Sequence, residues 1–394
     1  MRVAVLSDWW MPEIVGGAEV SSAGATNQLA RKHEVKVFTV GNPKRNVRLE
    51  NNIDLRYSRG LILRKQVNTK LVVKVLEKIR VVFDVVTPMV FTSKLVKSKP
   101  KVIVIHQIDR IGIYVIPLLK AFLPKVPIVR VFHDLSDTCS IRSRFRNDTV
   151  CKRTCLGCLP KQTFHKTIAN RFYDATVTNS HFTEEKLKTL GFRLFQNKIG
   201  YPFSPGELEL GKVEKPCNLE FEKNFYEIGF VGRVNHEKGV EQIIQSLSGR
   251  DTNYRLHLVG RVESSYKNFL IKVSKDLKVK IVFYDFIEKP YEELFIKIST
   301  LVVASITEES FGLIPIEAAE HGIPCIVSKL GGLLEAASFI EPPPLSFDPE
   351  NVQELGESLD SRRPLRILLV NLPIDLSMGS TINKVVDSFN LKES

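Results

Sequence analysis

Short apolar runs alternate along the chain with longer segments in which apolar positions recur at helical spacing. In the first half, the apolar runs that favour buried strands are residues 2–7, 35–40, 53–57, 102–106, 128–132 and 175–178. Helical spacing marks residues 18–31, 163–172 and 183–190. Strands that alternate with helices are typical of a parallel sheet covered on both faces. The pattern therefore predicts an α/β domain with a doubly wound sheet.

The same alternation starts again in the second half. A turn-rich segment at residues 201–206 opens a polar, charged stretch that runs to about residue 224. Beyond it we expect strands at residues 226–231, 255–259, 279–283, 301–304 and 324–327, and helices at 240–247, 264–276, 291–298 and 352–359. We therefore expect two domains, residues 1–205 and 206–378, followed by a terminal helix at residues 379–394.

A tight turn between a predicted strand and a predicted helix lies at Phe311-Gly312. Pro315 suits the first turn of that helix, and Gly322 suits its end. Ligands of open parallel sheets bind at the carboxyl ends of strands, and a helix start suits a phosphate. Glu309 and Glu317 flank the turn and can both accept hydrogen bonds from sugar hydroxyls. The alternative is that Glu317 only complements the helix dipole and Glu309 is a solvated charge.

Two further loops follow predicted strands and suit a diphosphate. Arg233 and Lys238 precede the helix at residues 240–247, where a guanidinium fork and an ammonium can meet phosphate oxygens. Two such cations are also common on a solvated surface. Gly16 and Gly17 end the loop after the first strand and allow close approach of a ligand, although a plain tight turn explains them equally well. That loop lacks the G-x-G-x-x-G dinucleotide fingerprint.

Polar residues also end two strands of the first domain. His133 follows the strand predicted at residues 128–132, and Asn179-Ser180 follows the strand at residues 175–178. Both positions fall at the ligand edge of a parallel sheet. A single histidine is more often structural than catalytic, so position alone leaves both roles open for His133.

The chain is strongly basic. Its 394 residues include 56 lysines and arginines and 44 aspartates and glutamates, for a net charge of +12. This balance favours anionic partners such as sugar nucleotides, phospholipid surfaces or nucleic acid, but no nucleic-acid-binding module is recognisable. The opening apolar run is too short for a signal peptide, and no stretch has the length of a transmembrane helix. We therefore expect a cytoplasmic protein, peripheral on the cytoplasmic face of the membrane.

Residues 63–101 carry the densest positive charge. Apolar positions recur there at helical spacing among ten lysines and arginines, with Glu77 and Asp84 as the opposing acids. Pro88 is expected to kink or end the helix. One interpretation is a basic amphipathic surface that docks on anionic lipid headgroups. The other is a core-packing helix with a solvated basic face.

Four cysteines lie in the basic stretch at residues 139–158, namely Cys139, Cys151, Cys155 and Cys158. Four thiols can hold a structural zinc ion or an iron–sulfur cluster. The spacing is not that of a clean zinc knuckle, so free thiols are the alternative. Catalytic cysteine chemistry is not expected, because nothing indicates a paired base.

The loops of the second domain together resemble a known family. Glu309 and Glu317, with Phe311-Gly312 between them, resemble the E-x7-E signature of the retaining glycosyltransferases of family 4, within the glycosyl transferases group 1. Residues 232–239 resemble the G-R-x-x-x-x-K-G loop of the same family. The resemblance implies the GT-B fold, in which two Rossmann-like doubly wound domains face each other across a cleft. It also implies that the helix at residues 379–394 crosses back onto the first domain.

The resemblance also implies roles for individual residues. Arg233 and Lys238 would stabilise charge on the leaving diphosphate, with no catalytic metal required. Glu309 would hold the donor sugar and Glu317 the ribose, while His133 would contact the transferred sugar. The remaining donor contacts would come from Gly16, Gly17, Phe311, Gly312 and Leu313. The insertion at residues 139–158 would be a structural lid on the acceptor side.

We therefore expect a retaining glycosyltransferase that moves a sugar from a nucleotide-diphosphate sugar to a hydroxyl of a glycan or lipid-linked acceptor. A nucleotide-sugar epimerase on the same fold is the alternative, and it would need acid and base carboxylates in the cleft. A non-enzymatic nucleic-acid-binding protein is the weakest of the three, and nucleic acid is not an expected partner.

Overall fold

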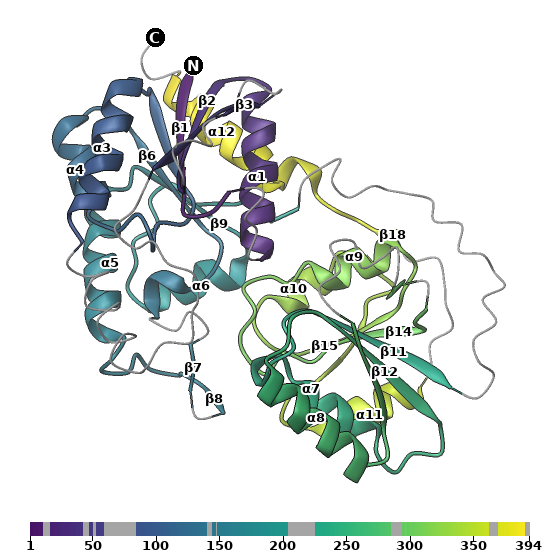
Figure 1. Cartoon of the computed structure of the whole chain (residues 1–394). Helices are drawn as coiled ribbons and strands as arrows, with labels where there is room; N and C mark the ends of the chain where they lie inside the picture. The colour runs from purple at the N-terminus through teal and green to yellow at the C-terminus, as the bar shows by residue number, and fades with distance from the viewer. Residues whose placement is uncertain are drawn as a thin grey trace. The chain divides into compact units, whose positions relative to one another are not determined.

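In a computed structural model, the chain divides into two compact units, each built on a parallel sheet (Figure 1). Unit 1 comprises Met1–Arg142, Thr154–Glu207 and Pro373–Ser394, and unit 2 comprises Ser143–Arg153 and Leu208–Leu372. The structure describes residues 1–10, 16–41, 47–49, 53–58, 84–139, 144–146, 148–203, 225–284, 294–295, 297–361 and 369–390.

The eight-stranded sheet of unit 1 has the order β10-β9-β6-β5-β1-β2-β4-β3. Its strands are β1 (Arg2–Ser7), β2 (Glu34–Val40), β3 (Val47–Leu49), β4 (Ile53–Ser58), β5 (Val102–Ile105), β6 (Ile128–Phe132), β9 (Ala175–Thr178) and β10 (Lys198–Ile199). Neighbouring strands are parallel except β3, which pairs antiparallel with β4. The predicted parallel sheet is confirmed, and the antiparallel edge strand is an addition.

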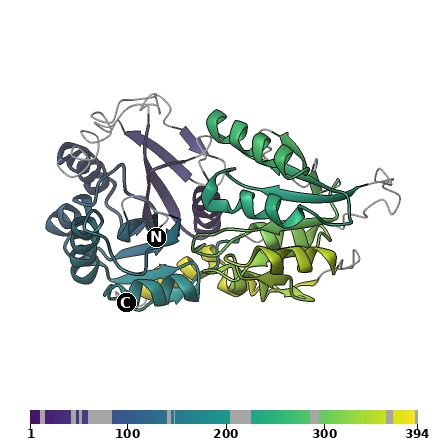
Figure 2. The same ribbon diagram turned by 90° about the horizontal axis from the view of Figure 1, so that it is seen from below.

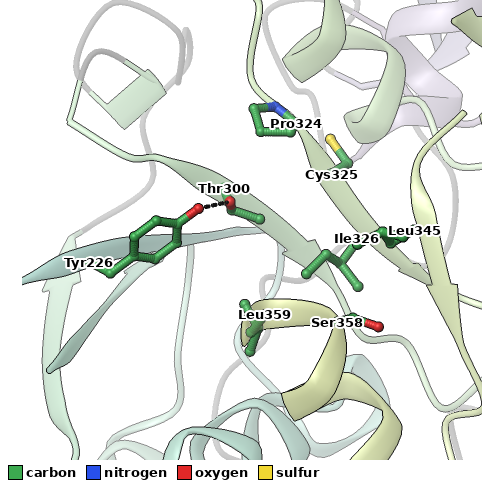
Figure 3. Close-up of a pocket in the computed structure, with 8 residues that line it drawn as sticks. All are labelled: Tyr226, Thr300, Pro324, Cys325, Ile326, Leu345, Ser358 and Leu359. Carbon is green, nitrogen blue, oxygen red and sulfur yellow. Dashed lines mark hydrogen bonds between the residues drawn. The ribbon is translucent and has the colours of Figure 1, made fainter. Parts of the chain in front are cut away.

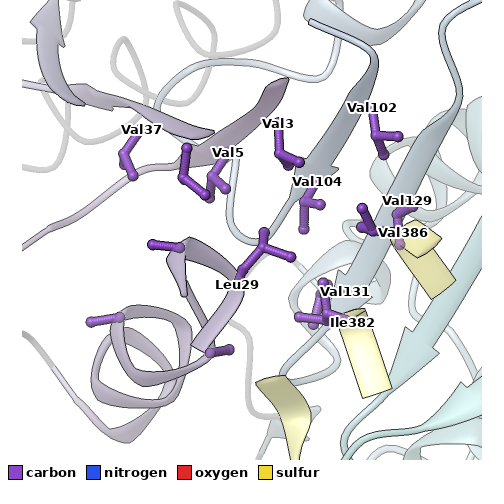
Figure 4. Close-up of a cluster of buried hydrophobic side chains, with 14 of the residues drawn as sticks. Val3, Val5, Leu29, Val37, Val102, Val104, Val129, Val131, Ile382 and Val386 are labelled. Carbon is purple, nitrogen blue, oxygen red and sulfur yellow. The ribbon is translucent and has the colours of Figure 1, made fainter. Parts of the chain in front are cut away.

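Helices cover both faces of this sheet. They are α1 (Gly17–Ala30), α3 (Val86–Ser98), α4 (Val115–Phe122), α5 (Leu159–Phe172), α6 (His181–Thr189) and α12 (Met378–Asn390). Side chains alternate between the faces of a strand, so each strand contributes to two cores. Val3 and Val5 pack in the core beneath α1 and α12 (Figure 4), while Ala4 and Leu6 pack on the side of α3 to α6. The C-terminal helix α12 lies against α1.

Unit 2 has a six-stranded parallel sheet in the order β13-β12-β11-β14-β15-β17, between helices (Figure 2). The strands are β11 (Tyr226–Val231), β12 (Tyr254–Val259), β13 (Lys280–Tyr284), β14 (Thr300–Val303), β15 (Cys325–Ser328) and β17 (Leu345–Phe347). One core packs against α7 (Val240–Leu247), α8 (Ser264–Asp276) and α11 (Val352–Asp360). The other packs against α9 (Ile314–Glu320) and α10 (Leu333–Ala337). Of the helix predicted at residues 291–298, the structure describes only residues 294–295 and 297–298.

The cysteine-rich insertion is divided differently from the prediction, which assigned residues 139–158 to the first domain. Ser143–Arg153 clusters with unit 2. This segment holds the hairpin of β7 (Phe145–Arg146) and β8 (Thr149–Val150). The Phe145 ring lies 6.2 Å from the ring of His236, and Asp148 Oδ1 lies 3.0 Å from His236 Nε2. The hairpin therefore belongs by its contacts to unit 2, although unit 1 precedes and follows it in sequence.

The basic segment also differs from the prediction in its described part, whereas residues 63–83 lie outside the described residues. Pro88 neither kinks nor ends a helix: it lies in the first turn of α3, where an N–H group has no intrahelical partner to lose. Phe91 is buried, whereas Val86 is 54% and Val90 37% exposed, so the apolar stripe divides between core and solvent. Among the described residues, no helix combines the length and the apolar character needed to cross a bilayer.

Candidate functional site

Three loops meet at the carboxyl edge of the unit 2 sheet, after the neighbouring strands β11, β14 and β15. The strand order places β12 on one side of β11 and β14 on the other, so the chain changes direction between β11 and β14. Ligands of open α/β sheets bind at such switch points. Backbone hydrogen bonds join the loops: Ile306 N donates to Glu237 O at 3.1 Å, and Gly332 N donates to Glu309 O at 2.6 Å. The loops therefore form one framework.

Two glycines allow this close approach. Gly239 has φ +69°, and a Cβ there would lie 1.9 Å from the carbonyl oxygen of Ala304. Gly312 has φ +94°, and a Cβ there would lie 2.4 Å from Leu333 Cδ2. A side chain at Gly239 would push two loops of the framework apart, whereas a side chain at Gly312 would displace the Leu333 side chain and strain the left-handed backbone.

An ion pair bridges the switch point, between Lys238 Nζ and Glu309 Oε1. Ser305 Oγ donates a hydrogen bond to the same carboxylate oxygen at 2.6 Å. Burial would raise the pKa of Glu309, but the charge and hydrogen bond of Lys238, the hydrogen bond of Ser305 and the charge of Arg233 together hold the pKa below its usual value. Arg233 itself is exposed. The loops thus gather an ionised carboxylate and two cations, groups that suit hydroxyl donors and phosphate oxygens.

The turn at Phe311-Gly312 leads into α9 as predicted. Phe311 is buried and anchors the turn, Leu313 caps the helix and Pro315 lies in its first turn. Glu317 follows in the first turn and is half-buried. Burial raises the pKa of Glu317 to about 7. This carboxyl group therefore changes its charge near neutral pH, in contrast to Glu309.

The carboxyl edge of the unit 1 sheet has polar residues at the ends of four neighbouring strands. Asp8 follows β1, His106 follows β5, His133 follows β6 and Asn179 follows β9, and all four are buried. Asp8 accepts hydrogen bonds from two backbone N–H groups after β5, at 2.9 and 3.0 Å. Asn179 Nδ2 donates to the carbonyl oxygen of His133 at 2.7 Å. The structure thus places the predicted residue His133 at a strand edge where buried polar side chains are hydrogen-bonded to the backbone.

His133 has a partner that the sequence analysis missed. His106 Nδ1 lies 2.7 Å from His133 Nε2, and the two rings stack with centroids 5.0 Å apart. Burial lowers the pKa of both imidazoles, to about 3 for His133, and the nearby Arg130 charge adds to the effect. His106 is the last residue of the strand predicted at residues 102–106, so the sequence already placed it at a strand end. Ser305, which binds Glu309, gave no comparable signal.

Gly16 and Gly17 lie at the start of α1, in unit 1. Gly16 has extended backbone with φ −173°, and a Cβ on Gly17 would meet nothing within 4 Å. Residues 11–15 of the same loop lie outside the described residues. A role of this loop in donor binding stays a prediction.

Two of the four clustered thiols come together. Cys139 Sγ and Cys158 Sγ are 3.6 Å apart, and both residues are buried. In the part of the chain that the structure describes, no three His, Cys, Asp or Glu side chains converge as metal ligands would. A structural zinc site needs four ligands. The described geometry does not show such a set, and a metal held by all four cysteines stays a prediction.

A separate pocket lies at the amino ends of the unit 2 strands (Figure 3). Tyr226, Thr300, Cys325 and Leu345, which begin β11, β14, β15 and β17, contribute to its lining, and Tyr226 Oη lies 2.9 Å from Thr300 Oγ1. Ligands of such sheets bind at the opposite, carboxyl edge. We therefore do not assign this pocket to the candidate site.

Comparison with known families decides what kind of domain carries the three loops. Residues 214–361 match the family Glycosyl transferases group 1. Unit 2 therefore contains a glycosyl transferases group 1 domain. This domain includes all three loops of the switch point, and the two residues of its ion pair lie in the two motifs that resembled the family in sequence.

Curated relatives support the same assignment. The chain is 31% identical over 108 residues to an uncharacterized glycosyltransferase of Methanocaldococcus jannaschii, a match that covers 27% of this chain and 28% of the relative. It is 25% identical over 166 residues to CapM of Staphylococcus aureus, a capsular polysaccharide biosynthesis glycosyltransferase, with 40% of this chain and 41% of the relative covered. These matches span less than half of the length of the relatives.

Solved structures extend the likeness to the whole chain. HepE of Anabaena, solved in complex with UDP and glucose, matches 100% of this chain and 98% of its own at 16% identity and a TM-score of 0.65. Sucrose-phosphate synthase of Thermosynechococcus elongatus matches 100% and 97% at 15% identity and a TM-score of 0.70. The fold class is confirmed: the chain has the two Rossmann-like units of the GT-B glycosyltransferases.

Proposed function

We propose that the protein is a retaining glycosyltransferase of family 4 that transfers a sugar from a nucleotide-diphosphate sugar to a hydroxyl of a glycan or lipid-linked acceptor. The observation that carries the proposal is the Lys238–Glu309 ion pair at the switch point of a glycosyl transferases group 1 domain. The complex of HepE with UDP and glucose supports the donor class. The role of CapM as a capsular polysaccharide biosynthesis glycosyltransferase supports a glycan acceptor.

The ion pair suggests how the donor binds. A diphosphate would draw Lys238 and the exposed Arg233 to its oxygens, and Glu309 would then be free to accept hydrogen bonds from the donor sugar. Both cations stabilise the charge that grows on the diphosphate as the anomeric C–O bond breaks. The acceptor oxygen bonds to the anomeric carbon on the face that the diphosphate leaves, and the acceptor proton passes to the departing phosphate oxygen.

The remaining predicted residues complete the donor site in this proposal. Glu317 accepts hydrogen bonds from the ribose hydroxyls. Backbone N–H groups of the turn at residues 311–313 meet the donor, the loop ending at Gly16 and Gly17 meets the diphosphate, and His133 contacts the transferred sugar. None of these residues is a nucleophile for a double displacement.

The first test is a panel of nucleotide-diphosphate sugars, starting with UDP-glucose, scored by thermal shift. A ligand that binds the native state stabilises it by RT ln(1 + [L]/Kd), about 2.7 kcal/mol at 100 times Kd. At least one member should raise the Tm, and the same donor should be consumed when glycan acceptors are added. The absence of any shift would contradict the proposal. An epimer formed from donor alone would indicate the epimerase, and salt-sensitive RNA binding without donor binding would indicate a nucleic-acid binder.

We also propose that transfer needs no catalytic metal, because Arg233 and Lys238 supply the positive charge that the diphosphate requires. Transfer by protein treated with EDTA should equal that of untreated protein. The cysteine cluster is proposed to hold structural zinc or an iron–sulfur cluster. Protein purified anaerobically should then contain bound zinc or iron, and less than about a tenth of an equivalent of the two together would contradict it.

A membrane location is the last part of the proposal. The start of α3 exposes Val85, Val86 and Met89 by 50% or more, and Lys97 and Lys99 are exposed near its end. We expect this surface to bind anionic headgroups on the cytoplasmic face, with about 1 kcal/mol from each lysine near the surface. Vesicle co-sedimentation should show binding to anionic but not to neutral lipid, weakened by salt. Equal partitioning to both lipids would contradict it.

A further inference from the structure

Two buried imidazoles share one hydrogen bond at the carboxyl edge of unit 1. The 2.7 Å distance between His106 Nδ1 and His133 Nε2 requires one proton between the two nitrogens. Each ring is almost completely buried, at 1% and 6% exposure. Burial disfavours the imidazolium form in both, and the Arg130 guanidinium disfavours it further. The pair is therefore neutral, and its proton arrangement fixes which nitrogen of His133 carries a hydrogen.

The backbone on both sides of the pair is held in place. His106 N donates to Leu6 O on β1 at 2.9 Å. On the other side, Asn179 N donates to Phe132 O at 3.2 Å, and Asn179 Nδ2 donates to the carbonyl oxygen of His133 at 2.7 Å. Because β5 and β6 are neighbours in the sheet, the two histidines stand side by side at adjacent strand ends. The rings therefore have little freedom to separate.

One nitrogen of the pair is left over. His133 Nδ1 is buried and has no hydrogen-bond partner among the described residues. A buried polar atom without a partner costs about 1–3 kcal/mol, and in native proteins such an atom has an explanation such as a catalytic role or a bound water or ion. The hydrogen bond at Nε2 decides whether this free nitrogen donates or accepts, because a neutral imidazole carries one proton.

We propose that His106 is a positioning residue, whose imidazole fixes the tautomer and the orientation of His133 so that Nδ1 meets a hydroxyl of the transferred sugar. The inference rests on the proposed glycosyl transfer and adds a residue to it. A sugar hydroxyl both donates and accepts hydrogen bonds, so either fixed tautomer can serve. The shared hydrogen bond couples the two rings, so that His133 Nδ1 carries a proton only when His106 Nδ1 does, and it holds the ring of His133 in one orientation.

The test compares His106→Asn, His106→Phe and a matched control, His33→Phe. An asparagine amide places a polar group near the position of the imidazole Nδ1, whereas phenylalanine keeps the bulk and removes the hydrogen bond. His33 is a buried histidine of the same unit, 8% exposed, that precedes β2 at the amino edge of the sheet. Its replacement controls for the general cost of losing a buried imidazole in unit 1.

The decisive readout is the tautomer of His133, followed by ¹⁵N NMR of labelled imidazoles and assigned with His133→Gln. We expect a single tautomer in the wild type, in His106→Asn and in His33→Phe, and a mixture or the opposite tautomer in His106→Phe. An unchanged tautomer in a folded His106→Phe protein would overturn the proposal. This result does not depend on activity, so it stands apart from failure of the proposed function, which would show as no donor binding by the wild type.

Kinetics give the second readout. Loss of a partner that orients a metal-ligating histidine typically costs about 10–100-fold in activity, and we expect the same scale for a partner that orients His133. His106→Phe should lower kcat by this amount. It should leave the Kd for UDP within about twofold, because Arg233 and Lys238, the cations proposed to bind the diphosphate, lie in unit 2. His106→Asn should stay within about threefold of the wild type. Equal losses in His106→Asn and His106→Phe, or a parallel loss of UDP affinity, would indicate a merely structural pair and overturn the proposal.

Discussion

The carboxyl edges of the two sheets belong to the same kind of fold but differ in the charge of the side chains that meet there. In unit 2 the edge is charged: Lys238 and Glu309 form an ion pair and Arg233 lies exposed beside them. In unit 1 the edge contains a neutral pair, because burial keeps the imidazoles of His106 and His133 uncharged. Burial also raises the pKa of Asp8 to about 6, helped by the charge of Asp109.

The difference follows from what surrounds each group. Glu309 stays ionised despite its burial because Lys238 and Ser305 compensate for the lost water. The two histidines have each other and a nearby guanidinium, which opposes protonation. A pair of opposite charges suits a diphosphate whose charge changes during the reaction, whereas a neutral, fixed pair of imidazoles suits hydroxyl groups that need orientation. The predictions below test this contrast.

The largest effect is expected from Lys238→Ala. The variant removes a cation from the diphosphate and leaves Glu309 buried without its ion-pair partner. We expect kcat/KM to fall by about 10²–10³, or about 2.7–4 kcal/mol. Lys188→Ala, which removes the exposed pair between Lys188 and Glu184 on unit 1, is the control and should change kcat/KM less than twofold, roughly. Steady-state kinetics measure both variants. Near-wild-type turnover of Lys238→Ala would show that the charged edge does not take part in the mechanism.

The next effect concerns the framework of the charged edge. Gly239→Ala forces a Cβ against the carbonyl oxygen of Ala304 at 1.9 Å, whereas Gly249, with the same φ of +69°, has nothing within 4 Å. Gly239→Ala and the control Gly249→Ala each place a side chain on a residue with left-handed φ, which costs about 1–2 kcal/mol. Gly239→Ala should lose a further 1–3 kcal/mol, roughly, through overpacking. Urea unfolding measures the free energy of unfolding of both variants. Equal losses of stability would show that the loops move apart at no cost in free energy.

A smaller effect is expected from pH. Burial raises the pKa of Glu317 to about 7, so the carboxyl is protonated at pH 6 and ionised at pH 8. If only the carboxylate accepts the ribose hydroxyls, the affinity for UDP-glucose should be about tenfold weaker at pH 6 than at pH 8. The charge of the diphosphate does not change over this range. Isothermal titration calorimetry at several pH values checks the trend.

Two variants serve as controls for the pH effect. Glu317→Gln should flatten the profile. Glu320→Gln, which removes the neighbouring carboxyl whose pKa is also about 7, should keep the trend. An affinity that rises toward low pH would assign Glu317 to repulsion of the diphosphate instead of binding.

The smallest effect tests how the hairpin of β7 and β8 bears on the charged edge. Burial would lower the pKa of His236, but Glu241 and Asp148 raise it above its usual value. Asp148 is 79% exposed in its side chain, so Asp148→Asn should lower the pKa of His236 only slightly. Glu241→Gln should lower it further. If an NMR titration gives the same pKa for His236 in Asp148→Asn as in the wild type, the hairpin has no electrostatic influence on the charged edge.

The sequence was most informative where function and backbone geometry coincide. In unit 2, glycines and prolines mark the turns, and the motifs at residues 232–239 and 309–317 identified the ion-paired residues before any contact was known. Strands such as β1, β6, β9 and β11 have the predicted ends, because continuous apolar runs are typical of buried parallel strands. The order of these strands in each sheet followed only from the tertiary structure.

What the tertiary structure alone decided are the contacts between residues far apart in the chain. The pairing of His106 with His133, the bond from Ser305 to Glu309 and the membership of residues 143–153 in unit 2 leave no periodic trace in the sequence. A hydrophobic period reports which side of an element is buried, but not which neighbour covers it. The sequence by itself determined the two α/β units and their ligand edges. The packing of strand ends determined that one edge carries an ion pair and the other a neutral pair of imidazoles, because pKa values depend on burial and on partners that only folding brings together.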